Sequence, residues 1–135
     1  TIYYVPHWDA QNLTQSERKH VNYLRRKMKC CLKQEGAERV AEALGDLEIE
    51  GKFKKDEPGP RNPDTVIRDR MWGPEVILSR EYFEWDTETQ VKTLLHETHH
   101  YLTDNWEDPE PNPHDRFKHR TYEWIRKCLR EEGVM

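Results

Sequence analysis

Two histidines flank a glutamate in LLHETHHYL, an otherwise apolar stretch at residues 94–102. The segment His96-Glu97-Thr98-His99-His100 satisfies the pattern H-E-x-x-H. Residues four apart share one face of a helix, so His96 and His100 can hold the same divalent ion, expected to be a single Zn²⁺. Such an ion lowers the pKa of a bound water to about 7 and polarises a carbonyl group.

Glu97 has the position of a general base. It precedes His100 by three residues, close enough to face a zinc-bound water without ligating the metal. It would accept the proton of that water and pass it to the leaving amine of a peptide bond. The pattern therefore predicts a zinc metalloendopeptidase acting on protein substrates. The alternative, a helix with solvent-facing histidines, is disfavoured because apolar residues such as Leu94 and Leu95 surround much of the helix.

A catalytic zinc site needs a third protein ligand and an open position. His114 is the best candidate, because residues 101–113 leave enough chain to finish the helix, turn and return. His119, Asp115 and Glu123 are alternatives, and either carboxylate would give a site of two histidines and one carboxylate.

The remaining histidines have simpler interpretations. His99 projects to a different side of the helix from the His96–His100 pair and is expected to be a packing or surface residue. His7 and His20 have no ligand spacing and are interpreted as ordinary surface residues.

Periodicity and turn residues predict one α+β domain covering residues 1–135, with an N-terminal helix, a small three- to four-stranded antiparallel-type sheet, a helix carrying H-E-x-x-H and a C-terminal helix. The Thr14–Glu17 spacing is that of a capping box, and Gly36 is expected to break the helix that follows. The expected elements are a strand at residues 2–5, helical stripes from 14 to about 35 and from 37 to 44, strands at 47–53, 65–72 and 75–78, a helix from Asp86 or Thr87 to Leu102, and a helix at 115–129. The proline-rich segments 55–64 and 106–113 are expected to be loops.

The composition is polar, with 34% hydrophobic and 36% charged residues and a mean hydropathy of −1.15. No segment approaches the roughly 18 apolar residues of a membrane span, and no signal peptide is evident at the start. The three cysteines lack regular spacing, so neither a disulfide framework nor a thiolate zinc knuckle is expected. These features predict an intracellular protein, cytoplasmic or associated with the nucleoid or nucleus, with no membrane partner.

Positive charge is concentrated between Arg18 and Lys33, although the net charge of the whole chain is −4. This stretch contains no acidic residue, and Arg25, Arg26 and Lys29 are its candidate nucleic-acid contacts. The competing interpretation is a solvated helix face balanced by acidic loops elsewhere. The tryptophans Trp72, Trp85, Trp106 and Trp124 are interpreted as packing residues, and Trp106, in the second proline-rich segment, is the candidate among them for a substrate contact.

Residues 65–125 resemble the SprT-like (Spartan-type) zinc metallopeptidases. VILSREYFEWDTETQVKTLLHETHHYL is similar to the family's strand followed by its active-site helix, and PHDRFKHR is similar to the segment of its third histidine. The family usually has Gly after that histidine, where this chain has Asp115. The resemblance implies a minimal catalytic domain with His96, His100 and His114 as zinc ligands, Glu97 as general base, and substrates that include DNA-associated proteins. A non-catalytic, zinc-stabilised module that binds nucleic acid or protein is the alternative.

Overall fold

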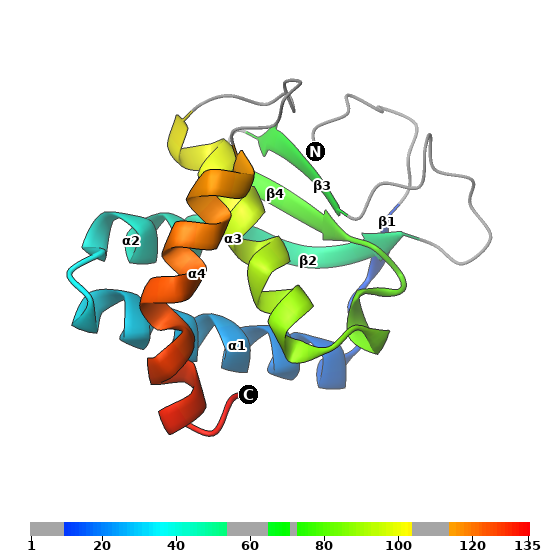
Figure 1. Ribbon diagram of the computed structural model, residues 1–135. Helices are drawn as coiled ribbons and strands as arrows, with labels where there is room; N and C mark the ends of the chain where they lie inside the picture. Colours follow the sequence, from blue (N-terminus) through cyan, green and yellow to red (C-terminus); the bar gives the residue numbers. More distant parts are fainter. Residues whose placement is uncertain (1–9, 54–64, 71–72, 104–113) are drawn as a thin grey trace.

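A computed structural model describes the backbone of residues 10–53, 65–70, 73–103 and 114–135, and their side chains except at 10, 53, 65–70, 73 and 114–119. Four helices and four strands form an α+β fold (Figure 1). In chain order the elements are β1 (Ala10–Asn12), α1 (Gln15–Gln34), α2 (Glu38–Asp46), β2 (Glu48–Phe53), β3 (Thr65–Arg70), β4 (Gly73–Leu78), the short 3₁₀ helix η1 (Tyr82–Glu84), α3 (Thr87–Thr103) and α4 (His114–Glu131).

The sheet is mixed, with strand order β1-β2-β4-β3, so the expectation of an antiparallel-type sheet is wrong in part. β1 and β3 are antiparallel to their neighbours, but β2 and β4 run parallel. The physical reason lies in β4, where Val76, Ile77 and Leu78 are all buried. A continuous apolar run needs cover on both faces and therefore occupies a central position. The antiparallel β3–β4 pair consequently joins the sheet through β4, with β3 at the edge.

The capping box predicted at the start of α1 is confirmed. The Thr14 N–H donates to Oε1 of Glu17 at 2.9 Å, and the Glu17 N–H donates to Oγ1 of Thr14 at 3.2 Å. The predicted break at Gly36 is confirmed as well, since α1 ends at Gln34 and Gly36 has a φ of 78°. A positive φ suits glycine because it has no Cβ to clash with the backbone.

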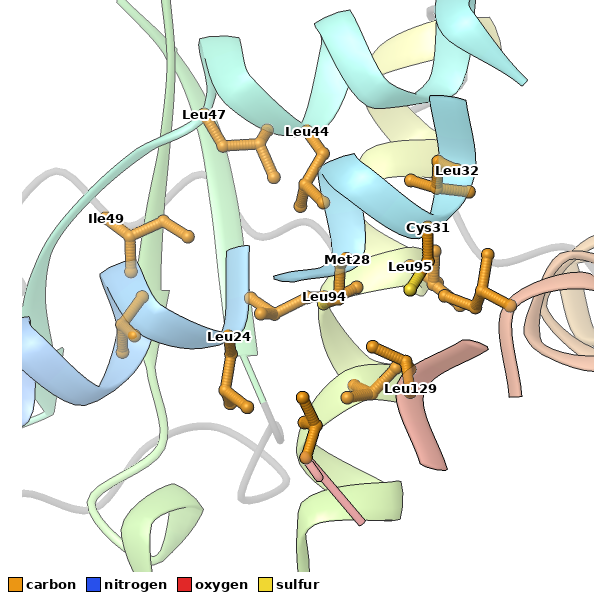
Figure 2. Close-up of a cluster of buried hydrophobic side chains, with 14 of the residues drawn as sticks. Leu24, Met28, Cys31, Leu32, Leu44, Leu47, Ile49, Leu94, Leu95 and Leu129 are labelled. Carbon is orange, nitrogen blue, oxygen red and sulfur yellow. The ribbon is translucent and has the colours of Figure 1, made fainter. Parts of the chain in front are cut away.

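The core is one cluster of buried side chains to which α1, α2, β2, β4, α3 and α4 all contribute. Leucines from four helices meet in it, among them Leu24, Leu44, Leu94 and Leu129 (Figure 2). Burying an aliphatic side chain of this size stabilises the fold by about 1.5–3 kcal/mol. The apolar faces predicted for the helices therefore pack together in one core.

α3 and α4 lie side by side and run in opposite directions (Figure 1). α3 begins as predicted, because Asp86 Oδ1 accepts a hydrogen bond from the Thr89 N–H at 2.8 Å. The strand expected at residues 2–5 and the loops expected at 55–64 and 106–113 lie outside the described residues. β1 was not predicted. None of the described helices is both long enough and apolar enough to cross a bilayer.

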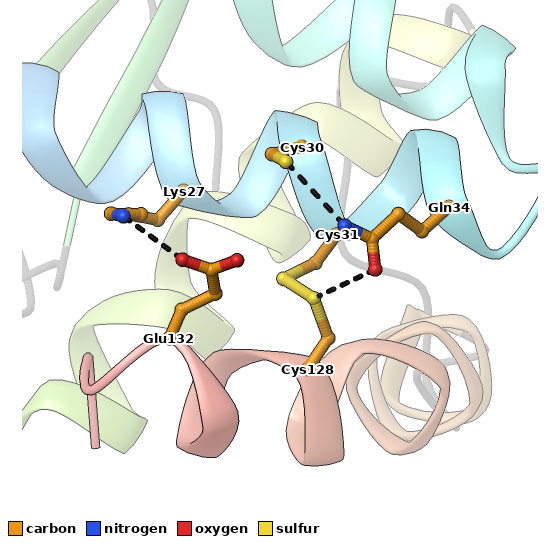
Figure 3. Close-up of a disulfide and its surroundings, with 6 residues drawn as sticks. All are labelled: Lys27, Cys30, Cys31, Gln34, Cys128 and Glu132. Atoms are coloured by element: carbon orange, nitrogen blue, oxygen red, sulfur yellow. Dashed lines mark hydrogen bonds and ion pairs between the residues drawn. A yellow bond between two sulfur atoms is a disulfide. The ribbon is translucent and has the colours of Figure 1, made fainter.

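A disulfide joins Cys31 of α1 to Cys128 of α4, which the irregular spacing of the three cysteines did not predict (Figure 3). Spacing could not reveal the pair, because its members are 97 residues apart in sequence and meet only when α4 packs against α1. Cys30 is a free, exposed cysteine. Disulfides persist mainly in oxidising compartments, so the bond counts against the reducing compartment on which the prediction of an intracellular location rested.

Reduction of this disulfide is expected to lower the free energy of unfolding by about 2–4 kcal/mol, because the bond closes a long loop and restricts the unfolded chain. Thermal unfolding with and without dithiothreitol measures the effect. Cys128→Ser should unfold at the lower temperature under both conditions, whereas Cys30→Ser, which removes only the exposed thiol, should behave as the wild type does. Equal midpoints for the oxidised and reduced protein would contradict the prediction.

Candidate metal centre

His96 and His100 of α3 bring their imidazole rings into contact. Their Nε2 atoms are 3.1 Å apart, and the ring planes meet at 79°. Two nitrogens bound to one tetrahedral zinc at 2.0–2.1 Å would lie about 3.3 Å apart. The observed separation also suits a hydrogen bond between the rings, one donating and the other accepting. The pair is therefore held in an arrangement that a metal ion can occupy with little movement.

The two imidazoles differ in their access to solvent. His100 is completely buried, at 0% exposure, whereas His96 is half-buried. Leu94 and Leu95 immediately before the pair are also fully buried, so the core packing of α3 fixes the direction of both rings. Access to the point between the rings is therefore expected from the side of His96.

Glu97 places a carboxylate inside the same helix interface, at 1% exposure. An ionised carboxylate is costly to bury without compensating charge or hydrogen bonds. A divalent cation held by the neighbouring imidazoles would supply such charge. The chemistry of the two histidines as nitrogen donors fits a metal site, and Glu97 is buried on the same helix.

The position of α4 bears on the third ligand. The ammonium of Lys92 lies 4.7 Å from the centre of the Tyr122 ring, so the side chains of these two positions of α3 and α4 meet. Because the helices are antiparallel, moving from 92 to 100 in α3 corresponds to moving from 122 to 114 in α4 (Figure 1). With a rise of about 1.5 Å per residue in both helices, the start of α4 is expected to lie closer to His100 than Glu123 does.

This register separates the candidates for the third ligand. Asp115 is one residue further along α4 and His119 is five, or roughly 7 Å along the axis. Glu123 lies roughly 13 Å beyond His114, and its carboxylate is 3.7 Å from the Arg126 guanidinium. The backbone thus favours the start of α4 over Glu123. The side chains of 114–119 lie outside the described part of the chain, so His114 as third ligand stays a prediction.

Within the described residues, no group of three or more His, Cys, Asp or Glu side chains gathers around one point. The structure brings together the first two predicted ligands, His96 and His100, and buries the predicted base, Glu97, on the same helix. His99 is half-buried.

The sequence did not reveal the role of His20. It is half-buried, and its Nε2 lies 2.9 Å from Oε1 of Gln90 in α3. The side-chain amide of Gln90 donates to the backbone carbonyl of Tyr82 at 2.7 Å, and the Tyr82 hydroxyl donates to the backbone carbonyl of Gln90 at 3.0 Å. These bonds tie α1 and η1 to the start of α3. The available signal was Gln90 itself, a polar residue on the apolar stripe of the helix.

The three candidate nucleic-acid contacts, Arg25, Arg26 and Lys29, line one hollow on α1, together with Lys33. They do not belong to a continuous basic track, because two of their basic neighbours pair with carboxylates. Arg18 lies 2.8 Å from Glu50, and Lys27 lies 3.1 Å from Glu132, a contact drawn in Figure 3. The basic stretch of the sequence therefore has two kinds of cation: those that line one compact hollow, and Arg18 and Lys27, whose charges are paired with carboxylates.

Comparison of the chain with models of protein families, with curated proteins and with solved structures finds no match. The likeness to SprT-like metallopeptidases therefore rests on the sequence stretches quoted above and stays a hypothesis.

Proposed function

We propose that the protein is a zinc-dependent metallopeptidase that hydrolyses peptide bonds in protein substrates. The observation that supports this proposal most directly is the approach of His96 and His100, with Nε2 atoms 3.1 Å apart, on the helix that also carries the buried Glu97. In this proposal His96 and His100 bind the zinc ion, and His114 completes the set of protein ligands. When bound, zinc would act as a Lewis acid that polarises the scissile carbonyl and lowers the pKa of water.

Glu97 supplies the proton transfers. As general base, its carboxylate takes a proton from the attacking water, and as general acid it returns the proton to the leaving amine. Proton transfer by a positioned side chain contributes about 10²–10⁴-fold to a rate. The packing of Leu94 and Leu95 serves this step, because it holds the helix on which the base and both imidazoles are mounted.

The main alternative is a non-catalytic, zinc-stabilised module that binds nucleic acid or protein. A purely structural zinc site requires four closed ligands and no adjacent carboxylate base. The buried Glu97 next to the pair thus favours catalysis. Action on DNA-associated proteins and an intracellular location stay predictions from the sequence.

Zinc binding is expected to be stoichiometric and to raise the unfolding temperature, because a ligand that binds only the folded state stabilises it, by about 2.7 kcal/mol at a concentration 100 times Kd. Calorimetric titration of metal-depleted protein measures the stoichiometry and affinity, and thermal unfolding with and without zinc measures the shift in unfolding temperature. His96→Ala should lose most of the affinity, whereas His99→Ala, its neighbour on α3 outside the pair, should retain it. A comparison of His114→Ala with Glu123→Ala identifies the third ligand, with the loss expected at His114. Undiminished binding by His96→Ala would contradict the site.

Glu97→Gln is expected to keep its zinc and to cleave casein about 10²–10⁴-fold more slowly, because the amide cannot accept the proton of water. Elemental analysis and the initial rate of cleavage are the two measurements. Glu88→Gln is the matched control, since it makes the same change on the exposed first turn of α3, where Glu88 lies 2.8 Å from Lys92.

Full activity in Glu97→Gln would overturn the assignment of the base. Zinc retained by a wild-type protein that cleaves neither casein nor DNA-bound protein would instead favour the non-catalytic module.

A further inference from the structure

A hollow of about 490 Å³ lies on α1 beside the C-terminal end of α2. Its lining includes Asn22, Arg25, Arg26, Lys29, Lys33 and Gly45. Four of these residues are cationic, and none of the lining residues is acidic. The volume is within the range of small-molecule sites, about 300–1,000 Å³. The hollow thus combines the size of a ligand site with a strong preference for negative charge.

Arg25 forms a fixed part of this lining. Its Nη1 donates to the Leu47 carbonyl at 2.6 Å and the Leu44 carbonyl at 3.4 Å, and its Nη2 donates to the Asn22 side-chain oxygen at 3.4 Å. These bonds occupy carbonyls at the end of α2, so Arg25 also has a structural role. A guanidinium carries five N–H donors, and the remaining ones can bind an oxyanion without rearrangement of the side chain.

Lys29 approaches α2 closely because residue 45 is glycine. A Cβ built on Gly45 would lie 2.8 Å from the Lys29 Nζ atom, closer than such atoms approach. Among the residues that the structure describes, neither Lys29 nor Lys33 forms an ion pair. Their charges are therefore available to a ligand, and the glycine sets the position of the Lys29 ammonium.

Acidic groups lie nearby but outside the lining. Glu48 and Glu50 act electrostatically on Arg25, and Asp46 is the exposed neighbour of Gly45. Glu50 is itself engaged by Arg18 at 2.8 Å. These carboxylates reduce the positive potential at the Arg25 end of the hollow, and they leave the Lys29–Lys33 end as its more positive part.

The span of the cations identifies the kind of anion. Arg25 and Lys33 are eight residues apart on α1, or about 12 Å along its axis. A single phosphate is too small to contact charges spread over this distance, whereas linked phosphates carrying several negative charges match both the span and the charge. We propose that the hollow binds the polyphosphate group of a small phosphorylated compound, at a site separate from the His96–His100 pair.

Isothermal titration with sodium tripolyphosphate at low ionic strength tests the site, with orthophosphate as the single-phosphate comparison. One tripolyphosphate should bind per chain, more tightly than orthophosphate. Lys29→Gln combined with Lys33→Gln should weaken binding more than tenfold, since the anion loses its charge-assisted hydrogen bonds to both ammonium groups. Lys19→Gln combined with Lys127→Gln is the control of equal charge change, because both lysines are exposed and lie outside the lining.

Gly45→Ala distinguishes an effect on ligand affinity from an effect on the stability of the fold. The new methyl group displaces the flexible end of Lys29, so affinity for tripolyphosphate should fall several-fold. The unfolding temperature should stay equal or rise, because alanine is favoured over glycine within a helix. His96→Ala should bind tripolyphosphate as the wild type does, which distinguishes the hollow from chelation at the predicted zinc site.

Three results would overturn the proposal. The first is no binding of tripolyphosphate at millimolar concentration and low salt. The second is an equal loss of affinity in the control pair of lysine variants, which would indicate only a general effect of net charge. The third is binding of a DNA duplex without binding of tripolyphosphate, which would assign the cations to a nucleic-acid backbone.

Discussion

The burial of ionisable side chains on a helix that also builds the core is the constraint on which the candidate site depends. α3 presents Leu94 and Leu95 to the interior at 0% exposure, and Glu97 and His100 follow them into the same interface. Turning this helix by one residue would rotate it about 100° and bring a leucine toward solvent. The hydrophobic packing therefore fixes the direction of the imidazoles and the carboxylate more firmly than their own contacts would.

α1 also carries both apolar and charged side chains, and it places them on different faces. Leu24 and Met28 are buried in the core, while Arg25 and Lys29, each one residue later, lie along the hollow beside α2. Successive helical residues point about 100° apart, so a run rich in both leucine-like and basic residues divides into two surfaces. The charge of this helix thus gathers on one side, where the end of α2 supplies carbonyl acceptors for Arg25.

Local patterns predicted the parts of the fold that local physics determines. The Thr14–Glu17 box, the glycine after α1, the Asp86 cap and the imidazoles four residues apart each depend on a few adjacent residues. The hydrogen bond between His20 and Gln90 was missed, because it joins positions 70 residues apart. The parallel β2–β4 pair was missed for the same kind of reason, since strand order depends on the packing of all the elements.

The identity of the third ligand also depends on contacts between residues far apart in the sequence. Spacing favoured His114 but left His119, Asp115 and Glu123 open, because the register of this helix against α3 was unknown. The structure sets that register through the far half of α4, where Ile125 and Leu129 are buried and Cys128 is bonded to α1. Because a helix is stiff, anchoring its C-terminal half also sets the level of its first residue. The disulfide and the core contacts of α4, both remote from the histidine pair, therefore direct the start of α4, rather than Glu123, toward the His100 end of α3 (Figure 1).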